Sequence, residues 1–139
     1  MRSGARLAFE LSQFRAPEPD VAFVRTARLH LVSERRMVGG PDIAVEIVSR
    51  DSRQRDYGEK KQLYAEASVS EYWIVDPLQR RVEFHRLQAG RYELVPLEHN
   101  HIFCSVVLEG FWLDVEWLLT DPLPKAYEKL QEIVAWHSA

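Results

Sequence analysis

Three side chains in the first half of the sequence have types and positions suited to phosphodiester chemistry. Glu46 lies within the apolar, β-branched run 42–48, which predicts a buried strand, and a buried carboxylate is costly unless something compensates it. Asp20 begins another short strand directly after a proline, and Lys60 falls on the otherwise apolar face of a predicted helix. Two acids and one lysine that converge on a sheet edge suggest a metal-dependent phosphodiesterase.

The two acids meet if their strands pair antiparallel. In that case the start of the first strand lies opposite the end of the second, which brings Asp20 to Glu46. Asp42 shares the face of Glu46 but lies four residues away, roughly 13 Å along the strand, so we expect it to be a turn or strand-start residue. Two oxygen ligands on rigid strands suit Mg²⁺ or Mn²⁺, with water and substrate oxygens completing the shell. Paired strand acids also occur as plain salt-bridge partners, and that alternative stays open.

The segment 56–67 changes from alternating to helical spacing. Its apolar stripe consists of Tyr57, Leu63, Tyr64 and Ala67. At about 100° per residue, Lys60 lies near the centre of this stripe and Lys61 about 95° away from it, so Lys60 is predicted to point inward. There it could hold a water or hydroxide and stabilise charge on a phosphate, or its stem could simply lie along an apolar surface.

Length and composition favour a single globular domain over residues 1–139. Hydrophobic residues make up 46% and charged residues 28%, which excludes disordered and collagen-like classes. No apolar run approaches the roughly 18 residues of a membrane span and no leader opens the sequence, so we expect a cytoplasmic protein without a membrane partner. The single cysteine, Cys104, cannot form an intrachain disulfide and is predicted to be a small core residue.

Positive charge is concentrated beside the proposed site, although the net charge is −3. The residues expected to contact a DNA backbone are Arg50, Arg53, Arg55 and Lys61. The alternative is a solvated basic turn with no ligand. Local concentration, rather than the sum of charges, decides whether a nucleic acid is attracted.

The pattern of elements predicts an α+β fold with a mainly antiparallel sheet. Predicted strands cover residues 6–11, 20–25, 42–49, 71–75, 102–107 and 111–115, and a hairpin joins 81–84 to 91–94. Residues 28–40 are expected to form a polar connection, and an amphipathic helix is expected at 124–136.

Four segments, taken in order, resemble a known family. They are residues 19–24, 41–49, 55–60 with Tyr64, and 69–77, and the similarity runs from about Pro19 to Leu119. These segments are similar to the Uma-two family, a branch of the PD-(D/E)XK nuclease superfamily. The ordered set is far more specific than any one segment.

The resemblance implies a restriction-endonuclease-like core, with a mainly antiparallel or mixed sheet flanked by helices. This sequence departs from the family's pattern in its amino-terminal part, which we expect to be shortened. It implies that Asp20 and Glu46 bind Mg²⁺ or Mn²⁺ with help from the main-chain carbonyl of Ile47. Val48 occupies the usual third position of the signature, and Lys60 matches a lysine that has moved to the next helix.

The implied activity is Mg²⁺-dependent cleavage of DNA, and a homodimer would suit a duplex with two strands to cut. Two other hypotheses remain. The chain could be a non-catalytic module for DNA or protein binding that keeps a remnant site, or Glu46 and Lys60 could form an ion pair with only structural meaning.

Overall fold

A five-stranded mixed sheet lies at the centre of the computed structural model, which describes residues 6–13, 15–119, 128 and 130–132. The strand order is β2-β5-β6-β7-β8. The strands are β2 (Val21–Phe23), β5 (Ile43–Ile47), β6 (Glu71–Asp76), β7 (Arg81–Gln88) and β8 (Arg91–Leu94). Only β5 and β6 run parallel, and the other neighbours are antiparallel. The predicted α+β class is therefore confirmed.

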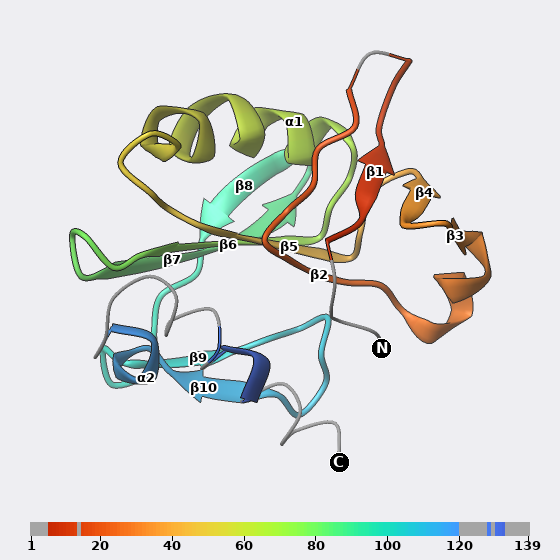
Figure 1. The fold of residues 1–139 in the computed structure, drawn as a ribbon. Helices are drawn as coiled ribbons and strands as arrows, with labels where there is room; N and C mark the ends of the chain where they lie inside the picture. Colours follow the sequence, from red (N-terminus) through yellow and green to blue (C-terminus); the bar gives the residue numbers. More distant parts are fainter. Residues whose placement is uncertain (1–5, 14, 120–127, 129, 133–139) are drawn as a thin grey trace.

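The connection from β5 to β6 covers one face of this sheet. Parallel neighbours need a crossover, because a tight turn cannot join them. A π-helical turn at Arg55–Glu59 and helix α1 (Lys60–Glu66) form this crossover, and Figure 1 shows α1 above the sheet. The crossover thus carries Lys60 past the end of β5.

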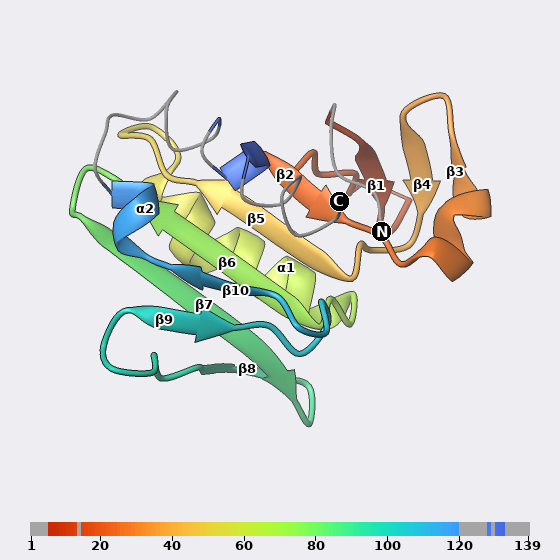
Figure 2. The same cartoon turned by 90° about the horizontal axis from the view of Figure 1, so that it is seen from below.

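The opposite face is covered by the antiparallel pair β9 (Ile102–Cys104) and β10 (Trp112–Asp114), followed by α2 (Glu116–Leu119). Figure 2 shows β9 and β10 lying across the strands of the large sheet. Every residue of β6 is buried, as expected for a strand covered on both faces.

Aromatic side chains fill the layer between β9–β10 and the sheet. The rings of Phe84 and Phe103 stack with centroids 3.7 Å apart, and Trp73 meets Phe103 edge-on at 5.3 Å. A smaller cluster under α1 includes Tyr64 and Tyr72. Trp73 and Tyr72 are therefore core residues.

Glu71, at the start of β6, connects the segment that follows β9 to the sheet through hydrogen bonds. Its buried carboxylate accepts hydrogen bonds from Trp73 Nε1 at 3.0 Å and from Ser105 Oγ at 3.0 and 3.1 Å. The main-chain N–H groups of Val106 and Val107 donate to it at 2.9 and 2.8 Å. This buried acid is compensated by neutral donors, as burial requires.

The prediction of a polar connection at 28–40 is wrong, because the segment contains regular structure. The segment overlaps a 3-10 helix (Thr26–Leu31) and contains β3 (Val32–Ser33) and β4 (Arg36–Val38), which pairs with β1 (Ala8–Glu10). Met37 is buried against Phe9 and Val24, so a small second core stabilises the segment. The turn between β3 and β4 has positive φ at two residues without the usual Asn-Gly signal, which hides it in the sequence.

Cys104 is exposed, so the prediction that it is a core residue is also wrong. Side chains alternate along a strand, and its neighbour Phe103 takes the buried face. The helix predicted at 124–136 lies outside the described residues, except for 128 and 130–132, which are helical. In the described part of the chain we find no helix whose length and hydropathy would allow it to span a bilayer.

Candidate active site

Asp20 and Glu46 lie opposite each other at the end of the β2–β5 pair. The register pairs Val21 with Val45 and Ala22 with Ala44, and one further step sets Asp20 against Glu46. The main-chain N–H of Asp20 donates to Oε1 of Glu46 at 3.3 Å. The predicted antiparallel pairing is confirmed, and with it the proximity of the two acids.

The carboxylate of Asp20 reaches the backbone of the neighbouring strand. Its Oδ2 accepts a hydrogen bond from the main-chain N–H of Ile47 at 2.7 Å, and its Oδ1 forms an ion pair with Arg6. The structure therefore brings together Asp20, Glu46 and Ile47, as expected. Whether the Ile47 carbonyl helps to bind a metal stays a prediction.

Glu46 is a buried acid with two partners on α1. Its side chain is 2% exposed, and its Oε2 accepts a hydrogen bond from the Tyr64 hydroxyl at 2.9 Å and lies 3.1 Å from Lys60 Nζ. Burial raises the pKa of Glu46 to about 7, and the positive charge of Lys60 opposes that rise only in part. Near neutral pH this carboxyl is poised between its two protonation states.

Lys60 points into the site, as the helical spacing indicates. Its Nζ lies 3.1 Å from Glu46 Oε2 and 3.3 Å from Oδ1 of Asp56, while its side chain is 26% exposed. Burial on its own would lower the pKa of Lys60, but the charges of Glu46 and Asp56 outweigh burial and raise it. The amine is therefore held as a cation.

Asp56 is a site residue that the sequence reasoning missed. It is 1% exposed, one turn before Lys60, and its Oδ2 accepts a hydrogen bond from Ser52 Oγ at 2.6 Å. The available signal was an acid four residues before a lysine on one helical face. An acid at the start of a predicted helix is usually exposed, which made this signal easy to overlook.

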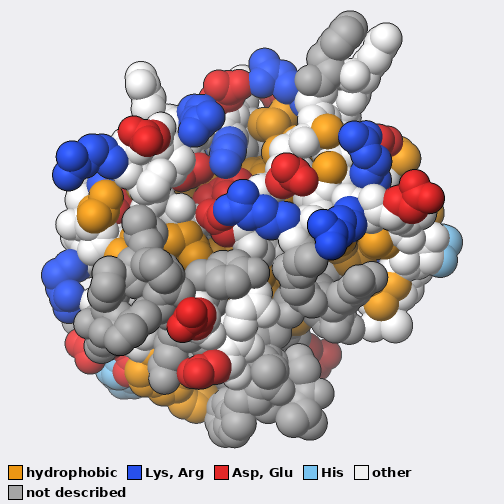
Figure 3. Space-filling model, viewed as in Figure 1, with side chains coloured by type: hydrophobic (Ala, Val, Ile, Leu, Met, Phe, Trp, Pro, Cys, Tyr) orange, Lys and Arg blue, Asp and Glu red, His pale blue; other side chains and the backbone are white. Residues whose placement is uncertain are grey.

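An open pocket of about 450 Å³ connects these groups to solvent. It is lined by four carboxylates and three cationic groups, those of Glu18, Asp20, Glu46, Asp56, Arg6, Arg55 and Lys60. Figure 3 shows Lys and Arg side chains beside a group of acidic side chains near the middle of this face. Charges of both signs therefore surround the opening.

The donor set fits a hard divalent cation that keeps part of its water shell. Asp20 and Glu46 supply carboxylate oxygens from neighbouring strands into the same pocket, and Mg²⁺ typically takes one or two protein carboxylates. No group of three or more His, Cys, Asp or Glu side chains in the described ranges is arranged to hold a metal ion. The pair would thus need water and ligand oxygens to complete the shell.

Asp42 has a structural role, as predicted for a strand-start residue. Its Oδ2 accepts a hydrogen bond from the main-chain N–H of Arg25 at 2.6 Å, and its Oδ1 pairs with Arg28 at 3.1 Å. These contacts fix the start of β5 rather than line the pocket.

The four basic residues predicted to contact DNA are placed differently from one another. Arg50 and Arg55 are exposed, and Arg55 lines the pocket. Lys61 lies near enough to His85 on β7 that its charge lowers the pKa of the histidine, after burial as the main cause. Arg53 binds the buried Asp76 through two nitrogens, at 2.6 and 3.2 Å, which gives it a structural role, and its contact with DNA stays a prediction.

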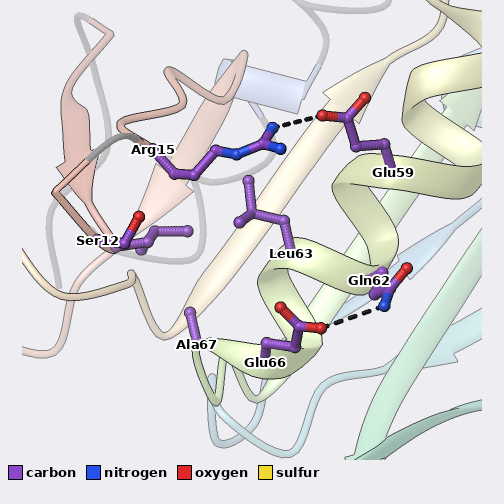
Figure 4. A pocket seen from close by; sticks show the side chains of 8 residues that line it. Ser12, Arg15, Glu59, Gln62, Leu63, Glu66 and Ala67 are labelled. Carbon is purple, nitrogen blue, oxygen red and sulfur yellow. Dashed lines mark hydrogen bonds and ion pairs between the residues drawn. The ribbon is translucent and has the colours of Figure 1, made fainter.

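A second pocket, of about 340 Å³, lies between α1 and the side chains of Leu11, Ser12 and Arg15 (Figure 4). Its acids are already engaged, because Glu59 pairs with Arg15 and Glu66 accepts a hydrogen bond from Gln62 at 3.2 Å. No two carboxylates face each other there among the lining residues. The pocket at Asp20 and Glu46 is therefore the stronger candidate.

Comparison with known proteins identifies a family and a shared fold. A family model described as "Putative restriction endonuclease" matches residues 2–116. The structure is similar to a crystal structure from Anabaena variabilis ATCC 29413, described as "a putative nuclease belonging to DUF820", with a TM-score of 0.61 and 17% identity. The similarity covers 93% of this chain and 69% of the other, and at that identity it shows a shared fold. The search of curated proteins found no match.

Proposed function

Because the chain belongs to the Uma2 family, whose model matches residues 2–116, we propose that it is a metal-dependent endonuclease that hydrolyses phosphodiester bonds in DNA. Asp20 and Glu46 would hold Mg²⁺ or Mn²⁺, with the Ile47 carbonyl beside them. The observation that carries this proposal is the meeting of the two acids and the Lys60 amine in one open pocket.

When bound, the divalent cation would polarise the phosphate and make a nearby water more acidic. Lys60, whose amine is held as a cation, can donate to a phosphate oxygen and stabilise the negative charge that grows there during attack. Tyr64 holds one oxygen of Glu46, and the Ile47 amide holds one oxygen of Asp20, so both acids keep fixed positions.

The basic residues at the rim would bind the polymer rather than perform the chemistry. Arg55 lines the pocket and Arg50 is exposed nearby in sequence, where each can contact a phosphate that flanks the cleaved bond. Since the net charge is −3, attraction of DNA would depend on this local group.

A second candidate function is favoured by the ion pairs themselves. Arg6 pairs with Asp20, and Lys60 lies between Glu46 and Asp56, so each of these three acids has a cationic neighbour within the chain. Such a site would be stable without a metal. A non-catalytic module that binds DNA or protein is consistent with this arrangement.

Cleavage of a labelled DNA duplex in Mg²⁺ or Mn²⁺ distinguishes the two functions. We expect metal-dependent cleavage by the wild type and a loss of at least about 100-fold in D20N and E46Q, since each change replaces a charged carboxylate of the proposed site by a neutral amide. E93Q, at an exposed acid on β8, should cleave like the wild type. A wild type that neither cleaves nor binds Mn²⁺ in calorimetry, while still folded, would favour the module.

A further inference from the structure

Three hydrogen bonds hold Asp56 in place, in addition to its contact with Lys60. Its Oδ2 accepts from Ser52 Oγ at 2.6 Å, and its main-chain N–H donates to the Ser52 carbonyl at 2.8 Å. The hydroxyl of Tyr72, in β6, donates to the main-chain carbonyl of Asp56 at 2.7 Å. The carboxylate is therefore fixed relative to both the preceding turn and the central sheet.

The second oxygen of this carboxylate faces Lys60. Oδ1 of Asp56 is buried, lies 3.3 Å from Lys60 Nζ, and has no hydrogen-bond donor in the described part of the chain. The contact is thus an ion pair without a well-aligned hydrogen bond. A buried carboxylate oxygen with this environment depends on the lysine for its compensation.

Lys60 is held between two carboxylates, but only one of them lies beside Asp20. Glu46 Oε2 is 3.1 Å from Nζ, and Glu46 is the acid that would also bind a divalent cation. A cation on Glu46 weakens the attraction of that acid for the lysine, since the two positive charges compete for it. Asp56 would then be the partner that keeps the amine in the pocket.

We propose that Asp56 is the positioning residue for Lys60, and that its ion pair keeps the lysine amine aimed at the phosphate while Glu46 binds metal. This inference rests on the proposed function for its catalytic consequence. The same ion pair should also keep the Lys60 side chain ordered, and this order can be measured without any cleavage assay.

The order of the Lys60 side chain is the first readout. NMR relaxation of its ε-methylene group is compared for the wild type and D56N, each with and without Mg²⁺. We expect the wild type to stay ordered in both conditions and D56N to become mobile, most strongly in Mg²⁺. E59Q is the matched control, because Glu59 is an exposed acid on the neighbouring turn that pairs with Arg15, and it should match the wild type.

Cleavage kinetics are the second readout. D56N should lower kcat by about 10- to 100-fold and leave KM within about twofold, because a misplaced group costs turnover rather than binding. D56E should restore part of the loss by returning the charge. If the role of Asp56 is purely structural, D56N will lower thermal stability, but Lys60 will stay ordered and kcat will not fall selectively relative to KM.

The outcomes separate this inference from the proposed function. An inactive wild type would refute the nuclease, while an ordered Lys60 that D56N mobilises would still support the positioning role. An equally ordered Lys60 in D56N and the wild type, with or without Mg²⁺, would overturn the inference. If D56N does not fold, S52A removes the hydrogen bond that holds the Asp56 carboxylate instead, and unchanged Lys60 order in S52A would count against the inference.

Discussion

The main-chain N–H of Asp20 donates to the side chain of Glu46, so one acid of the site holds the other through its backbone. The carboxylate of Asp20 in turn binds the amide of the residue that follows Glu46. This reciprocal contact depends on the register of β2 and β5, since a shift of one residue would turn one of the two acids to the opposite face. The candidate site therefore exists only in this register of β2 and β5.

The stability of the protein should fall as pH rises from about 4.5 to 7 because of Glu46. Burial raises its pKa from 4.5 to about 7, so between these values the folded state binds more protons than the unfolded state. The loss is about 3 kcal/mol by pH 8, at roughly 1.4 kcal/mol per unit of pKa difference. Urea unfolding from pH 5 to 8 should show this fall in the wild type and a flatter profile in E46Q. E93Q should follow the wild type, and a constant difference between E46Q and wild type across this range would contradict the assignment.

Replacement of Glu71 by Gln should destabilise the fold without touching the proposed site. The carboxylate of Glu71 accepts from Trp73, Ser105, Val106 and Val107, and an amide nitrogen in place of one oxygen sets donor against donor. We expect a loss of about 2–4 kcal/mol in the free energy of unfolding, measured in urea, because buried donors lose their acceptor. The exposed Glu93 again serves as the control, and a loss below about 0.5 kcal/mol in E71Q would show that the network contributes little.

Arg53 and Arg55 should respond to mutation in different ways. R55A should weaken DNA binding and reduce its salt dependence by about one phosphate contact, with little effect on folding. R53A should instead lower the free energy of unfolding by about 2 kcal/mol, because it leaves the buried carboxylate of Asp76 without its cation. Fluorescence anisotropy at several salt concentrations and urea unfolding measure the two effects. An R53A variant of normal stability that loses DNA affinity would instead support the predicted contact of this residue with DNA.

The sequence predicts the main parts of the site because each depends on local pattern. The apolar run around Glu46 defines β5, the proline before Asp20 marks the start of β2, and helical spacing directs Lys60 inward. These features rest on periodicity, which neighbouring residues determine, whereas the antiparallel pairing of β2 with β5 is a condition that the register meets.

Other features depend on contacts that no local pattern records. Asp56 is buried because Ser52 and Lys60 surround it, and the turn at 55–59 is π-helical rather than α-helical. Arg53 binds Asp76, which lies 23 positions later in the sequence, on the strand β6 that the crossover places next to β5. The small sheet of β1, β3 and β4 likewise forms only once Phe9 and Met37 share a core.

Oδ2 of Asp76 accepts hydrogen bonds from the guanidinium of Arg53 at 2.6 Å and from the hydroxyl of Tyr57 at 2.9 Å. Two contacts therefore join the segment between β5 and α1 to Asp76, the last residue of β6. They hold one wall of the pocket at Asp20 and Glu46 in place before any ligand binds. A polyanion that docks there would meet a preorganised surface, so most of the adaptation on binding would fall on the polyanion.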